Sequence, residues 1–150
     1  MAAPQLLHRG DMIVMVDWDN TETFTNFCGA TAISLNIENA MSETAVGDCD
    51  DWKLPVQTVV EYGAQTSTMT INAQLARSNL SKLLSWAKDQ LELPVRVHIV
   101  DAASGTVEYI DGVGLLTSQG IEGIGNTEGT ALTQTINVRF KHGIEFTNAA

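Results

Sequence analysis

The sequence predicts a mainly β, antiparallel fold with a single α-helix, and two observations carry this prediction. Most of the chain consists of short runs rich in Val, Ile and Thr in which apolar and polar residues alternate. Such alternation is typical of antiparallel strands with one buried and one solvated face. Only residues 78–92 have helical spacing. One helix cannot cover both faces of a parallel sheet, which disfavours an α/β nucleotide-binding fold.

We expect strands over 12–18, 32–38, 56–62, 66–75, 95–100, 107–116 and 130–141. Three of these runs alternate most clearly. Their apolar, inward sets are Ile33, Leu35 and Ile37; Met69, Ile71, Ala73 and Leu75; and Leu132, Ile136, Val138 and Phe140. Their polar sets include Ser34, Asn36 and Glu38 on the first run, and Thr66, Thr68 and Thr70 on the second. These six polar residues are candidates for a wet functional surface.

The helix is expected to begin with Ser78 as its N-cap and to end before Pro94, which forces Leu93 out of helical geometry. Its spacing indicates one apolar face. That face would comprise Leu80, Leu83, Leu84, Ala87 and Leu91.

Two long connections interrupt the strands of what we expect to be one domain over residues 1–150. Residues 41–55 are acidic and contain Gly47 and Pro55, and residues 118–129 carry four glycines. Connections this long in a compact domain are usually functional or disordered. We therefore expect residues 41–55 to extend from the domain.

The net charge of −10 disfavours sequence-independent binding to nucleic acid, although charge alone does not separate a functional role from solubility. A negative surface suits a protein that must let nucleic acid slide past. No apolar run is long enough to span a membrane, and residues 1–9 lack the features of a secretory signal, so we expect synthesis and assembly in a cytoplasm and no membrane anchor. There, Cys28 and Cys49 are expected as free thiols, although the sequence leaves their redox state open.

The strongest enzymatic alternative is an apolar strand that runs into Asp17-Trp18-Asp19-Asn20-Thr21. This D-x-D-x-T stretch resembles the nucleophile motif of haloacid dehalogenase-type phosphatases. That family also needs parallel strands with alternating helices and a later acidic pair, whereas Asp50 and Asp51 come too early. We predict no catalytic site, no cofactor and no metal site, with the acids at 48–51 in a solvated loop.

The order of elements resembles the tail tube (major tail) proteins of siphovirus-type phages and gene transfer agents. The likeness is carried by the strand from Cys28 to Ile37, the stretch Glu43-Thr44-Ala45-Val46-Gly47-Asp48-Cys49-Asp50-Asp51-Trp52, and the closing hairpin with Gly112-Val113-Gly114-Leu115-Leu116-Thr117-Ser118. It covers most of the chain at the level of pattern.

The resemblance implies two antiparallel sheets packed at a steep angle, as a sandwich or half-barrel with one flanking helix. Six copies would form a ring with a shared inner β-barrel, and stacked rings would enclose a negatively charged lumen for passage of double-stranded DNA without specific binding. Ser34, Asn36, Glu38, Thr66, Thr68 and Thr70 are then candidates to line the lumen, and Glu43, Asp48, Asp50, Asp51, Trp52 and Lys53 to contact the next ring.

Further partners implied are tape measure, terminator and distal tail proteins, and the place of the protein is the virion tail. A related ring component, such as a tail terminator or a secretion-tube protein, is the alternative within the same fold class. The sequence does not fix the host, the tube length or the presence of a sheath.

Overall fold

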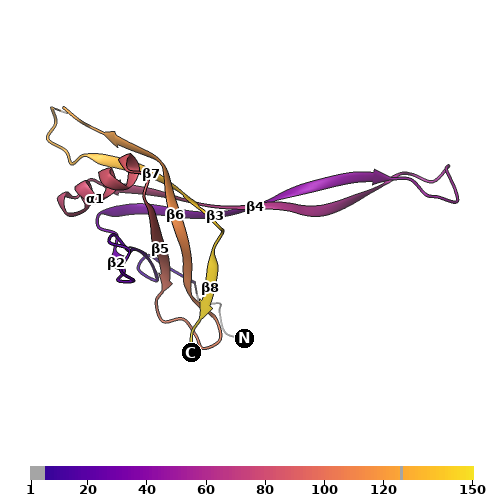
Figure 1. Cartoon of the computed structure of the whole chain (residues 1–150), viewed down its shortest axis with the longest axis horizontal. Coiled ribbons are helices and arrows are strands. Elements are labelled where there is room, and N and C mark those ends of the chain that lie inside the picture. The colour runs from indigo at the N-terminus through magenta and orange to yellow at the C-terminus, as the bar shows by residue number, and fades with distance from the viewer. Residues whose placement is uncertain (1–5, 126) are drawn as a thin grey trace.

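The computed structural model describes residues 6–125 and 127–150, so the first five residues of the N-terminal segment and Asn126 of the glycine-rich connection lie outside it. The mainly β fold with one helix is confirmed (Figure 1). The elements are β1 (Met12–Val16), β2 (Thr25–Asn26), β3 (Ala30–Val46), β4 (Gln57–Gln74), α1 (Arg77–Lys88), β5 (Glu92–Ile99), β6 (Val107–Glu122), β7 (Thr133–Phe140) and β8 (Glu145–Asn148). None of the described helices is long and apolar enough to cross a membrane.

The strands form one hydrogen-bonded antiparallel sheet in the order β2-β1-β5-β6-β7-β4-β3, with β8 paired to β6. The two expected sheets are therefore two parts of a single sheet, and the steep crossing between them is visible where β5, β6 and β8 run across the direction of β4 (Figure 1). The long strand β6 joins the parts, because its first half pairs with β5 and β8 and its second half with β7. A register shift between Leu116 and Ser118 lies at this junction. The sheet is not closed in the subunit.

The core lies where the curved sheet meets α1. Its fully buried side chains include Val16, Met69, Ile71, Leu83, Trp86, Val95, Ile136 and Val138. Two glycines of β6 allow this packing: a Cβ on Gly112 would lie 2.5 Å from the Phe140 ring, and one on Gly114 would lie 2.8 Å from Val138 Cγ1. The glycines leave room for large side chains on the neighbouring strands.

The helix differs from its expected form. It spans Arg77–Lys88 instead of 78–92, because β5 already begins at Glu92. Its N-cap is Ala76 without a side-chain cap, and the Ser78 hydroxyl instead donates to Asn79 Oδ1. The predicted Ser78 cap is therefore wrong. Its buried residues are Asn79, Leu83 and Trp86, whereas Leu84 and Leu91 are exposed. A broad apolar stripe does not by itself show which of its sides the sheet will cover.

Three strands run further than the alternation indicated. The segments expected at 56–62 and 66–75 are one strand, β4, and β3 continues through Met41 to Val46, so the first part of the predicted excursion at 41–55 is strand. Likewise, β6 continues to Glu122 inside the predicted loop at 118–129. Pairing with a neighbouring strand supplies the backbone hydrogen bonds that local composition does not reveal.

The predicted burial of Ile33 and Ile37 is wrong, and Leu35 is only partly buried. Ile33 and Ile37 are 38% and 42% exposed because β3 is the edge strand of the sheet. On the next strand, β4, the predicted inward residues Met69, Ile71 and Ala73 are fully buried. An apolar row is thus left partly open at the sheet edge, a feature that isolated soluble subunits usually avoid.

Candidate functional site: a polar strand face and a projecting arm

The six candidate lumen residues lie together as three direct cross-strand pairs. In the register of β3 and β4, Ser34 is opposite Thr70, Asn36 opposite Thr68, and Glu38 opposite Thr66. Direct partners in an antiparallel pair project from the same side of the sheet. We call the surface formed by these six side chains the polar face. The sequence predicted its members, and the tertiary structure shows that they are neighbours.

The polar face continues across the sheet through hydrogen-bonded side chains. Thr70 Oγ1 donates to Asn137 Oδ1 at 3.0 Å, and Asn137 Nδ2 donates to Ser118 Oγ at 2.7 Å. On β3, Asn36 Nδ2 donates to Glu38 Oε1 at 2.8 Å. These hydrogen bonds join uncharged side chains of three strands, with Glu38 as the charged member on β3. Arg139, opposite Thr68 on β7, brings a positive charge to this surface.

Beyond the polar face, β3 and β4 leave the body as a two-stranded arm, which we define as residues 39–65. It projects along the longest axis of the molecule (Figure 1). The reason is the length of the neighbouring strand, since β7 pairs only with Thr68–Gln74 of β4. All residues of the arm are exposed. An isolated two-stranded ribbon is only marginally stable, and its two open edges can pair with another chain.

The tip of the arm is an ordered acidic turn. The backbone N–H groups of Asp50 and Asp51 donate to Asp48 Oδ1 at 2.8 and 3.1 Å, and that of Lys53 donates to Asp51 Oδ1 at 3.0 Å. These backbone donors favour the ionised form and lower the pKa of Asp48 below its ordinary value, led by the bond from Asp50. The turn thus uses two of its carboxylates to hold its own backbone.

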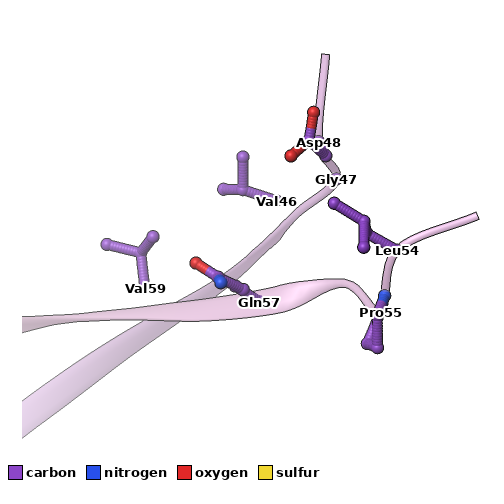
Figure 2. Close-up of a pocket in the computed structure, with 7 residues that line it drawn as sticks. All are labelled: Val46, Gly47, Asp48, Leu54, Pro55, Gln57 and Val59. Atoms are coloured by element: carbon purple, nitrogen blue, oxygen red, sulfur yellow. The ribbon is translucent and has the colours of Figure 1, made fainter. Parts of the chain in front are cut away.

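Next to this turn lies a shallow hollow of about 330 Å³ (Figure 2). Its lining residues are Val46, Gly47, Asp48, Leu54, Pro55, Gln57 and Val59. Trp52, one residue beyond the acidic cluster, is 91% exposed and lines a second hollow with Leu54 and Val56. A large aromatic side chain held in solvent beside exposed aliphatic residues is a candidate docking anchor.

The predicted contact residues do not all meet. Asp48, Asp50, Asp51, Trp52 and Lys53 are at the tip, whereas Glu43 lies back along β3, opposite Val60. Sequence reasoning missed Met41, Val60 and Tyr62, exposed apolar residues at the base of the arm. The signal that could have pointed to them is Gly63, which interrupts an otherwise continuous strand pattern.

The first aspartate of the D-x-D-x-T stretch, Asp17, has a structural role. Asp17 is buried, and its two carboxylate oxygens accept the backbone N–H groups of Thr21 (3.1 Å) and Glu22 (2.7 Å). It therefore caps the turn that follows β1. The neighbouring strand β5 is antiparallel to β1, unlike the parallel sheet that the phosphatase motif requires.

Within residues 6–125 and 127–150, no three His, Cys, Asp or Glu side chains gather as a metal site would require. Cys28 and Cys49 are exposed free thiols. Cys49 lies at the tip of the arm, and the carbonyl of Cys28 accepts a hydrogen bond from Asn79 of α1. The candidate site is thus a polar sheet surface with a projecting arm.

Comparison with known proteins agrees with this description. A family model described as phage tail tube protein matches residues 9–136. A comparison with curated protein sequences gives no significant match.

Several solved structures share the fold at low sequence identity. The tail of an empty gene transfer agent particle, solved with C6 symmetry, gives a TM-score of 0.72 at 12% identity and covers 95% of this chain and 99% of that one. The SPP1 tail tube gives 0.66 at 9% identity, covering 96% and 80%. The sheath-tube complex of an extracellular contractile injection system gives 0.64 at 14%, covering 96% and 93%.

These findings define a structural, non-enzymatic subunit of the virion tail. The chain belongs to the phage tail tube protein family, since the family model matches most of its length.

Proposed function

We propose that this chain forms hexameric rings that stack into a tube, with the polar face lining a negatively charged lumen for the passage of double-stranded DNA. The observation that carries the proposal is the polar face itself, an uninterrupted surface of paired Ser, Thr and Asn side chains with Glu38 at its end. The similar gene transfer agent tail was solved with C6 symmetry, which supports a six-fold ring.

The open edges of the sheet support ring formation. The outer edge of β3 pairs with no strand of the same subunit, and residues 57–67 of β4 lack a second neighbour. Pairing between subunits would satisfy these backbone groups, and closure into a barrel removes exposed edges altogether. Neighbouring copies would also cover Ile33 and Ile37, the apolar residues that the isolated subunit leaves open.

Electrostatics suits a lumen that does not hold DNA. The chain carries a net charge of −10. On the polar face the charged residue is Glu38, and the adjoining strand β7 contributes the positive charge of Arg139. Adhesion to DNA requires that phosphates be neutralised by several bases, with release of their counterions. Neutral hydroxyl and amide groups keep the wall hydrated without supplying that neutralisation.

The tip of the arm is proposed as an inter-ring contact with Trp52 as its anchor. Glu43, Asp48, Asp50, Asp51 and Lys53 would accompany Trp52, as the sequence indicated, and assembly would further restrict the motion of the segment Glu43 to Lys53. Tape measure, terminator and distal tail proteins are the further partners of such a tube. The match to a tail tube family model favours a tube subunit over a terminator.

The lumen assignment is tested by Asn36→Lys/Glu38→Lys, which adds three positive units of charge to the polar face. We expect tubes to form normally while DNA ejection is impeded, because new cations would contact phosphate. Glu145→Lys/Asn148→Lys is the matched control, since it adds the same charge at exposed positions of β8, outside the polar face, the arm and α1. Phage infectivity and ejection in vitro are the measurements, and normal ejection by the polar-face variant would refute the assignment.

A further inference from the structure

At the base of the arm, the register of β3 and β4 changes by one residue. Asn39 lies opposite Gln65, but Met41 lies opposite Tyr62, so that Ala40 faces both Gly63 and Ala64. One extra residue in one strand of an antiparallel pair is a β-bulge. A Cβ on Gly63 would lie only 3.2 Å from the Ala40 carbonyl oxygen, so glycine suits the close approach of the two backbones.

The bulge determines which side each residue of the arm takes. Side chains alternate along β3, so Met41 lies on the side opposite Glu38, and its direct partner Tyr62 lies there too. In a strand without the bulge, Tyr62 would share the side of Thr66, four residues away. The bulge therefore puts Tyr62 and Val60 on the side that carries the core in the body, and Glu61, opposite Ser42, on the side of the polar face.

We propose that the bulge orients the arm so that Met41, Val60 and Tyr62, its contact side, dock on the helix-bearing end of another copy of this chain. This inference rests on the stacked assembly proposed above. The three side chains are 54%, 55% and 75% exposed in the subunit, and they prolong the partly open apolar row of Ile33 and Ile37. On the opposite side, Ser42 and Glu61 prolong the polar face.

Charge identifies the end of the second copy that fits. Residues 38–61 carry six carboxylates and one base, whereas α1 carries three bases and no acid. These bases, Arg77, Lys82 and Lys88, are exposed and take part in no ion pair among the described residues. Two arms laid against each other would repel, whereas an arm laid on α1 would be attracted.

The placement of the two charged regions favours a repeating assembly. The arm and α1 lie at opposite ends of the long axis (Figure 1). A contact between opposite ends is heterologous, so the same contact can be repeated from copy to copy along a tube.

Two bulge variants test the orientation. Deletion of Ala64 removes the bulge but leaves Met41 opposite Tyr62 on the contact side. Insertion of one alanine between Ala40 and Met41 also removes the bulge, but it turns both residues to the side of the polar face. We expect the deletion variant to form tubes and the insertion variant to raise the critical concentration for tube growth about tenfold or more, the loss typical of a removed anchor.

Rings and tubes are counted separately by electron microscopy and sedimentation, and thermal unfolding reports whether each subunit is folded. Tube growth by the insertion variant as in the wild type would overturn the proposal, as would equal failure of both variants with folded subunits. If the wild-type protein formed no rings, this result would instead contradict the proposed ring assembly.

A charge exchange tests the occupant without altering the strands. Glu43→Lys/Asp50→Lys changes arm carboxylates that accept no hydrogen bond from the described residues, and Arg77→Glu/Lys82→Glu changes the helix. Each double variant alone is expected to lower the tube yield about tenfold. A combined variant that carries all four changes in one chain is expected to restore the yield. Absence of rescue in the combined variant, with rings intact, would show that the arm docks elsewhere.

Discussion

The body and the arm use the same two strands, β3 and β4, yet their side chains meet opposite environments. In the body, Met69 and Ile71 of β4 are buried, and they lie opposite Val138 and Ile136 of β7. In the arm, Val59, Val60 and Tyr62 of the same strand are exposed. Strand formation is therefore set by the pairing of β3 with β4, whereas burial is set by the neighbours that accompany them. The apolar side chains of the arm are not buried within the subunit and are accessible to another molecule.

The largest expected effect is a difference in subunit stability when a methionine is replaced in the body or in the arm. Met69→Ala in the body should cost about 2–5 kcal/mol of unfolding free energy, because it leaves a cavity in a packed core. Met41→Ala in the arm should change subunit stability by about 0.5 kcal/mol or less. Chemical denaturation of the isolated subunits measures both values. Equal losses would show that the arm is packed against the body in solution.

In a second prediction, about tube assembly, a substitution in the arm has a large effect although the subunit stays folded. Trp52→Ala should weaken each inter-ring contact by about 2 kcal/mol or more while leaving the subunit folded, since exposed aromatic anchors dominate interface energies. Repeated in every ring, this loss should abolish long tubes, which electron microscopy would reveal. Hydrogen exchange over Glu43 to Lys53 should show protection that increases from subunits to tubes. Normal polymerisation, or equal protection in both states, would make the tip an ordinary acidic loop.

A third prediction concerns how tightly the body is packed. Gly114→Ala should destabilise the subunit by about 1–3 kcal/mol, because the new Cβ would press on Val138, Val95 and Trp86. Gly120→Ala in the same strand is the matched control, since a Cβ there meets nothing within 4 Å. The difference in thermal midpoint between these two variants measures the strain. An equal shift for both would mean that the strand, not the core contact, is responsible.

The smallest expected effect lies at the tip of the arm. Asp48 has a lowered pKa in the folded protein, so its hydrogen bonds stabilise the turn fully above the ordinary value of 3.8, and this stabilisation is lost as the pH falls through the lower folded pKa. Amide exchange and chemical shifts of Asp50 and Asp51 should therefore change below pH 3.8 while core amides stay unchanged. Asp48→Asn, which keeps an acceptor oxygen, should remove this pH dependence.

The sequence by itself determined the strand-rich fold, the single helix and the members of the polar face. Alternation of side chains is a local property, so Ser34, Asn36 and Glu38 could be assigned to one side of a strand without knowledge of their neighbours. The same local rule identified Met69, Ile71 and Ala73 as core residues, and each is buried.

Only the tertiary structure decided which apolar rows are covered and how the arm is turned. Ile33 and Ile71 are direct cross-strand partners, but one is exposed at the sheet edge and the other is buried, because β7 flanks only β4. The helix likewise buries Trp86 rather than Leu84 because the sheet approaches it from that side. Alternation also could not assign Tyr62, since the extra residue in β4 reverses its side. Strand order, register and bulges arise from contacts between distant segments, and a local pattern carries no information about them.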